Sequence, residues 1–185
     1  SAINQTKELK DSSDDHSKTI TEIFIKSDKD TSSKIFEKLA EKKDKDTSKL
    51  ALNIVDNLTE NKDYEKKLDD ITKTSKDLDR NFNKILKDVV DFTKNKEDTE
   101  ILEKVLINSN TNTFKKIIDN SKQNSSIEKK INNILDKIIK KNPNKLIDII
   151  EEDDEILDNA TENEIDEESE NLKKKKTFDK NVSPN

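Results

Sequence analysis

The chain has 185 residues, of which 42% are charged and 28% hydrophobic, and its formal net charge at pH 7 is −6. It contains no Gly and no Cys, which excludes Gly-rich phosphate loops, dinucleotide-binding fingerprints, nucleophilic-serine elbows, disulfides and thiolate zinc sites. The acidic balance and a sequence pI of about 5.1 argue against nucleic acid as the main partner.

The first third of the chain predicts a flexible entry over residues 1–13 and then two helices. Asp14 or Asp15 is a candidate N-cap for the first, because a cap carboxylate accepts the free amide hydrogens of a first turn. The run DKDTSS at residues 28–33 offers caps for the second. The apolar residues behind these caps recur at helical spacing: they are Ile20, Ile23, Phe24, Ile35, Phe36, Leu39 and Ala40.

Five more helices are predicted in the middle of the chain, where the same spacing continues without strand-like alternation. For four of them candidate caps are available: Asp46 or Thr47, Asn61 or Asp63, Ser75, and Asp98. The fifth carries Phe114, Ile117 and Ile118.

Two last helices follow. The residues Ser125-Ser126-Ile127-Glu128 match a capping box, and Asn142-Pro143 is a typical helix start with Pro at the first position. Since the chain has no Gly for a left-handed C-cap, we expect Asn to replace it, as at Asn108 and Asn120.

The apolar pattern repeats at an offset of roughly 50 residues. Without a gap, Ile35 aligns with Ile85, Ala51 with Ile101, and Tyr64 with Phe114; a one-residue shift aligns Phe82 with Ile131. Each copy consists of one longer and two shorter predicted helices, with too few apolar residues to bury a core alone. The predicted fold class is all-α: a right- or left-handed stack of short helices, like an α-solenoid of three-helix repeats, or an irregular helical bundle.

The composition changes after Ile150, where an acidic run is followed by Lys173–Lys176. We therefore expect a helical-repeat domain over residues 14–159, and a charged helix end with a disordered tail over 160–185. The chain lacks Met, which predicts a mature product or a fragment from which an upstream segment has been removed.

No cluster of residues predicts catalysis, a cofactor, a metal or a small-molecule substrate. The acidic run lacks the turn Gly and the alternating ligands of a calcium-binding EF-hand, so a solvated acidic cap is favoured. The lysine run has no interleaved aromatic residues for base stacking. Asn57-Leu58-Thr59 fits the glycosylation pattern, but such matches occur by accident in an Asn-rich chain. No apolar run reaches the length of a membrane span.

The helical units, such as KIFEKLAEKK and KILKDVVDFT, resemble the helical-repeat domains of rickettsial surface antigens of the formin-like, actin-assembling type. The resemblance covers residues 21–159 and implies a bacterial surface or secreted virulence factor that acts on host actin. Leu172-Lys173-Lys174-Lys175-Lys176-Thr177 is similar to the Leu-Lys-Lys-Thr core of an actin-monomer-binding motif. That family's motif follows a short amphipathic helix, whereas residues 163–171 here are mostly acidic.

Two functions are consistent with these patterns. The first is a non-catalytic helical-repeat domain that binds another protein, which the resemblance would make a host cytoskeletal protein; the alternative is a structural stalk or scaffold without a specific ligand. The sequence does not identify the binding residues. A cytoplasmic location is the alternative to the bacterial surface or secretion. An exposed apolar patch would favour the first function, and a uniformly charged surface the second.

Overall fold

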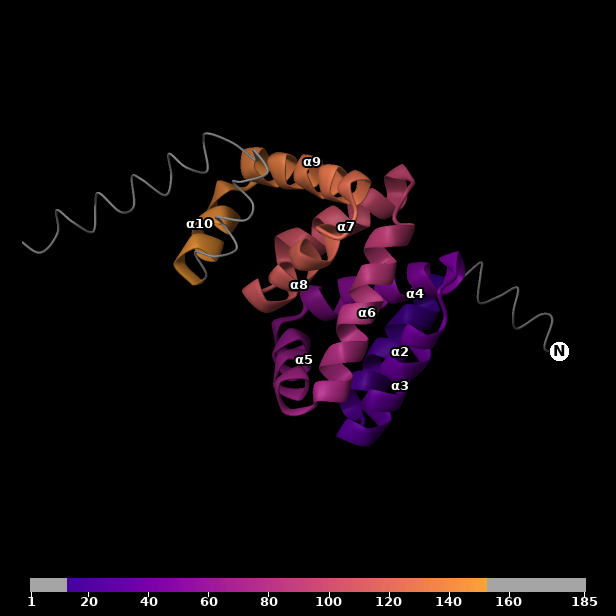
Figure 1. Cartoon of the computed structure of the whole chain (residues 1–185). Coiled ribbons are helices and arrows are strands. Elements are labelled where there is room, and N and C mark those ends of the chain that lie inside the picture. Colours follow the sequence, from indigo (N-terminus) through magenta and orange to yellow (C-terminus); the bar gives the residue numbers. More distant parts are fainter. Residues whose placement is uncertain (1–12, 153–185) are drawn as a thin grey trace, which may run out of the picture. The chain divides into compact units, whose positions relative to one another are not determined.

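The computed structural model describes residues 13–152, and this part of the chain folds into helices without any strand. In chain order the helices are α2 (Ser13–Lys26), α3 (Lys29–Glu41), α4 (Lys45–Glu60), α5 (Lys62–Thr74), α6 (Lys76–Phe92), α7 (Lys96–Asn108), α8 (Thr111–Ser121), α9 (Ser125–Lys141) and α10 (Pro143–Glu152) (Figure 1). The predicted all-α class is confirmed for these residues. The predicted entry up to residue 12 and the tail over 160–185 lie outside the described residues.

Very short connections with extended backbone join the helices. Asn61 ends α4 and caps α5 with φ −112° and ψ 115°, and Ser75 ends α5 and caps α6 in the same way. The predicted left-handed Asn at helix ends is wrong at both positions: α7 is followed by Ser109 with φ −66°, and Asn120 lies inside α8. An N-cap residue adopts extended backbone, in which its side chain accepts from the first amides of the next helix. Because the same residue also ends the preceding helix at these joints, no left-handed Gly is needed there.

The N-caps confirm part of the prediction and correct the rest. Asn61 and Ser75 are caps as predicted, and Asp28 caps α3 by accepting from the Thr31 amide at 2.8 Å. The prediction is late by two or more residues in two other helices, whose caps are Asp44 and Asn95. The predicted residues there lie inside the first turn and donate their backbone amides to the cap.

Two further N-terminal predictions are corrected in the same way. The predicted capping box is wrong because Asn124 caps α9 and accepts from the Ser126 amide at 2.9 Å. Helix α2 begins at Ser13, so Asp14 and Asp15 lie in its first turn. Pro143 is the first residue of α10, as predicted.

The described chain divides into two compact units, one up to Asn120 and one from Ser121 onward. In the first unit α4 packs against both α2 and α7, and α3 packs against α6. The pairs α3/α6 and α4/α7 are equivalent helices of the 50-residue repeat. These two equivalent pairs lie side by side, as expected of a helical stack, whereas the third equivalent pair, α5 and α8, is not among the closely packed helices. In the second unit α9 and α10 pack against each other and bury Ile134, Ile138 and Ile149.

Aromatic rings run through the core of the first unit. Phe24 of α2 stacks on Phe36 of α3 with ring centroids 4.6 Å apart, and Phe36 stacks on Phe82 of α6 at 5.6 Å. Val89 and Leu102, which the repeat assigned to the same core as Phe82, are buried as well. The helix lengths differ from the prediction in the first copy, where α4 with 16 residues exceeds α3 with 13.

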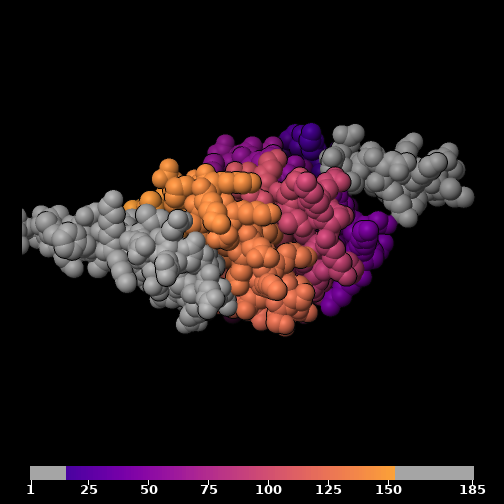
Figure 2. Space-filling model, turned by 90° about the horizontal axis from the view of Figure 1, so that it is seen from above, coloured from indigo at the N-terminus to yellow at the C-terminus, as the bar shows by residue number. Residues whose placement is uncertain are grey.

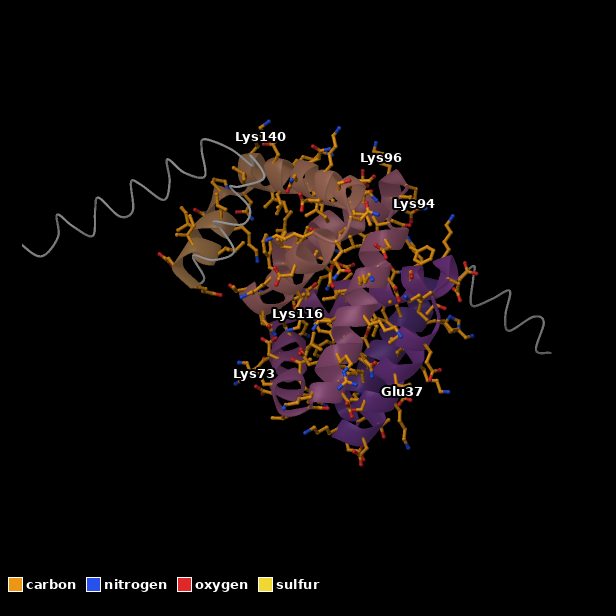
Figure 3. The ribbon with its side chains drawn as sticks, viewed as in Figure 1. Glu37, Lys73, Lys94, Lys96, Lys116 and Lys140 are labelled. Atoms are coloured by element: carbon orange, nitrogen blue, oxygen red, sulfur yellow. The ribbon has the colours of Figure 1, made fainter. Side chains whose placement is uncertain are left out.

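The connections at one edge of the first unit also lie together. Lys43, before α4, is close enough to influence Asp88 in α6, and Lys49 of α4 contacts Asp98 at the start of α7. Figure 2 shows the segment that enters α4 (purple) beside the α6–α7 connection (pink). Lys94 of that connection and Lys96, the first residue of α7, point away from the helices (Figure 3).

Candidate interaction groove

An open groove of about 350 Å³ lies on the first unit where α2, α4 and α5 meet; we call it the α2–α4–α5 groove. Helix α2 contributes Lys18, Thr21 and Glu22. The end of α4 and the start of α5 contribute Asn57, Glu60, Asn61 and Tyr64. Its volume is at the small end of the range of ligand sites, and the residues that line it are polar, charged or, at Tyr64, aromatic.

Hydrogen bonds between α2 and α4 form the floor of the groove. The side-chain amide of Asn57 donates to the hydroxyls of Ser17 and Thr21 at 3.2 and 3.4 Å. Thr21 in turn donates to the Ser17 carbonyl at 2.6 Å. At this point the two helices are held by hydrogen bonds to buried hydroxyls and not by apolar contacts. The directions of these hydrogen bonds determine how α2 is placed on α4.

One side of the groove carries a charge cluster. Lys104 of α7 contacts the carboxylates of Glu60 and Asp56 on α4, the latter at 3.5 Å. The hydrogen bond to Glu60 raises the pKa of Lys104, and the Asp56 charge adds to this effect. The cluster sits at the C-terminal end of α4, whose last turn has no basic residue of its own. Lys104 thus supplies the positive charge that favours a helix C-terminus.

The start of α5 presents Tyr64 to the groove. Asn61 holds this turn by accepting from the amides of Asp63 and Tyr64 at 3.0 and 3.3 Å. Tyr64 is the one tyrosine of a chain without tryptophan. Its ring is half-buried, and rings of this kind provide contact area at low conformational cost in protein interfaces.

A second ion pair fixes the stacking of α4 on α7 at the opposite end of the two helices. Lys49 contacts Asp98 at 2.5 Å and Glu97 at 3.7 Å. Here α4 supplies the cation, whereas at Lys104 it supplies the anions. From the first contact to the second, the residue number rises along α4 (Lys49 to Asp56) and also along α7 (Asp98 to Lys104). The two contacts can therefore form together only when the helices run parallel in this register.

Besides Asp98, two carboxylates of the first unit are almost completely buried. Glu65 is 2% exposed and accepts from the Asn110 amide at 2.7 Å, and Asp88 is 5% exposed. One oxygen of Asp88 has no hydrogen-bond partner. Burial disfavours the charged form and raises the pKa of both carboxyls. Neither carboxylate lines the α2–α4–α5 groove, and burial alone does not indicate catalysis.

Only some of the other sites considered in the sequence can be placed, because the acidic run beyond residue 152 and Lys173–Lys176 lie outside the described residues. Asn57-Leu58-Thr59 lies inside α4 with Thr59 fully buried, which prevents glycosylation of the folded chain. Among the described residues no three potential ligands from His, Cys, Asp and Glu come together as a metal site. None of the described helices has both the length and the apolar character needed to cross a membrane.

Comparisons with known proteins give no relative. No family model, curated protein or solved structure matches the chain.

The sequence prediction left the binding residues open, and a recognisable signal exists for two buried carboxylates outside the groove, Asp98 and Glu65. Asp98, Leu102 and Val105 recur at i, i+4 and i+7, so Asp98 occupies an apolar phase of its helix. The same is true of Glu65 before Leu68. A polar residue in an apolar phase predicts a buried partner. No such signal marks Asn57 or Tyr64 as neighbours of α2.

Proposed function

We propose that this chain is a non-catalytic helical-repeat domain that binds another protein through the α2–α4–α5 groove. The observation that supports this function is the groove itself, an open hollow that is lined from three helices. Its walls offer a half-buried phenol ring and amide groups, which can pair with the backbone of a bound segment. The actin partner implied by the resemblance is one specific form of this proposal.

A second candidate is a structural stalk or scaffold, and one observation favours it. Among the described residues Ile23, 47% exposed, is the only large apolar side chain on the surface. A surface without an apolar patch is typical of a domain that makes no strong hydrophobic interface. The two candidates differ in whether the groove has an occupant.

The test captures partners on the immobilised full chain and compares three forms. Tyr64→Ala removes the ring from the groove, while Lys73→Ala, on α5 but pointing away from the helices (Figure 3), serves as the matched control. We expect a protein that binds the wild type and Lys73→Ala and is lost with Tyr64→Ala. Actin is added separately in purified form. If every captured protein binds Tyr64→Ala equally well, the groove proposal is wrong and the stalk is favoured.

Fluorescence provides a direct second measurement. Since Tyr64 is the single tyrosine and tryptophan is absent, the intrinsic emission of the chain reports on the groove alone. A captured partner that lacks tryptophan and tyrosine, or a peptide from it, should change this emission in proportion to occupancy. A partner that binds without changing the emission uses another surface.

A further inference from the structure

Few apolar side chains anchor helix α5 in the first unit. Leu68 is its only buried apolar side chain, as Phe24 is the only one described in α2, and the other buried residues of α5 are Glu65 and Thr72. Its repeat equivalent α8 buries three apolar residues, Phe114, Ile117 and Ile118. At the position equivalent to Ile117, α5 has Lys67. At this position of the repeat α5 carries a charged side chain, whereas α8 buries an apolar one.

Polar bonds tie α5 to the connection between α2 and α3. The ammonium group of Lys67 donates to the carbonyls of Ile25 and Ser27, the latter at 3.1 Å. At the other end of α5, Lys29 of α3 donates to the Thr74 carbonyl at 3.1 Å. Both lysines bind carbonyls near a helix C-terminus, where positive charge is favoured.

A second set ties α5 to the connection between α7 and α8. Lys62 donates to the Asn108 carbonyl at 2.9 Å, and the Asn110 amide donates to Glu65 at 2.7 Å. Asp69 accepts from the side-chain amides of Asn110 and Asn112. Helix α5 therefore bridges two connections that belong to successive copies of the repeat. Figure 1 shows it beside α6, against which it packs.

The polar bonds that hold α5 can be replaced by bonds to water. Hydrogen bonds to carbonyls and amides are replaced by bonds to water when a segment opens, whereas lost apolar burial has no such replacement. The buried Glu65 carboxylate also regains its hydration on opening. By contrast α6 buries six apolar residues, including Phe82 and Leu86, and cannot open without exposing them.

Opening is also sterically possible while α4 and α6 stay in place. As a helix, the 13 residues of α5 span about 20 Å, at about 1.5 Å per residue. Unfolded, they can span roughly twice that distance, so the chain can still connect the end of α4 to the start of α6.

We propose that α5 is a clasp that opens as a unit while α4 and α6 remain folded, and that the α2–α4–α5 groove is complete only when the clasp is closed. Tyr64 lies in the first turn of α5, so its place in the groove depends on that helix. The effect on binding rests on the proposed function, whereas the opening is a property of the free chain. A groove ligand then stabilises the closed clasp by mass action, and its affinity falls as the open fraction rises.

Hydrogen exchange on the free full chain tests the clasp without any partner. We expect the amides of residues 66–74 to exchange at least about tenfold faster than those in the inner turns of α4 and α6. Low denaturant should leave their exchange almost unchanged, because a local opening exposes little surface. Equal exchange in all three helices, with the same steep denaturant dependence, would falsify the proposal.

Two variants separate a clasp from general weakening. Leu68→Ala should speed exchange in α5 at least about tenfold and leave α4 and α6 within about threefold of wild type. Glu65→Gln keeps an acceptor for the Asn110 amide but removes both the buried charge and the Lys62 ion pair, so it should change exchange in α5 and leave α4 and α6 within about threefold of wild type. Acceleration of all three helices by either substitution contradicts the clasp.

The consequence for binding has its own readout. A partner captured through the groove should slow exchange in α5 and should bind Leu68→Ala more weakly than wild type. If the free chain shows the α5 opening but no partner uses the groove, the proposed function fails and the clasp stands. If a partner uses the groove while α5 exchanges only by global unfolding, the clasp fails and the proposed function stands.

Discussion

Phe36 of α3 stacks on Phe82 of α6 with ring centroids 5.6 Å apart and an interplanar angle of 25°. The two rings come from successive copies of the repeat, and both are buried. They do not occupy equivalent positions, because Phe36 aligns with Leu86 and Phe82 with Ile131. The contact between copies is therefore made by side chains of different helical turns that interlock.

The first prediction concerns this stack. Phe82→Ala should lower the free energy of unfolding by about 3–5 kcal/mol, because it removes a fully buried ring and leaves a cavity between α3 and α6. Denaturant titration followed by circular dichroism measures the change. The control is Ile23→Ala on the exposed surface of α2, which should stay within about 0.5 kcal/mol. An equal effect of both substitutions would rule out a shared core at Phe82.

The second prediction concerns the register of α4 on α7. Lys49→Met should destabilise the chain by about 1–3 kcal/mol, since it leaves the nearly buried Asp98 carboxylate without its cation. Adding Asp98→Asn should recover part of the loss, with a coupling energy of about 0.5–3 kcal/mol in a double-mutant cycle. The exposed pair Lys38–Glu41 on α3 is the matched comparison, and its cycle should give at most about 0.5 kcal/mol. Equal coupling in the two pairs would contradict the prediction.

The third prediction follows from the buried Asp88. Its raised carboxyl pKa means that the folded state binds a proton more tightly than the unfolded state, whose reference value is 3.8. Asp88 therefore destabilises the fold above its folded pKa, and this cost disappears as the pH falls toward 3.8. Asp88→Asn should raise the free energy of unfolding at pH 7 by up to about 1 kcal/mol.

Urea titrations at pH 7 and near pH 4 check this dependence. The advantage of Asp88→Asn should be present at the higher pH and should shrink at the lower pH, where the wild-type carboxyl becomes protonated. Asp70→Asn, an exposed substitution on α5, is the control and should show no such gain. A gain that is the same at both values would mean that the charge of Asp88 is not its cause.

The fourth prediction concerns Asn95, the N-cap of α7. Asn95→Ala should cost about 1 kcal/mol, because the Asp98 amide loses the side-chain oxygen that accepts from it at 2.7 Å. Asn95→Asp retains an acceptor at the same place and should be tolerated. Thermal melts of the two variants measure the difference, and a loss of the same size in both would show that capping is not the reason.

By itself, the sequence determined the helices and most of the core. Hydrophobic spacing located Phe82, Val89 and Leu102 in a buried face because burial depends on local helical phase, which can be read along the chain. Caps were predicted less well. Asp, Asn, Ser and Thr stand close together before each helix, and only the actual hydrogen bond selects one of them, as at Asn95.

The tertiary structure alone decided which polar residues meet. Lys49 and Asp98 are 49 positions apart, and Glu65 reaches Asn110 across 45. Such contacts depend on the register in which equivalent helices stack. That register cannot be read from the sequence, because Lys, Asp and Asn are common along the chain and show no local pattern that pairs one with another. The same register brings α2, α4 and α5 together around Tyr64. The groove is thus a product of packing between helices, while the helices themselves are a product of the sequence within each one.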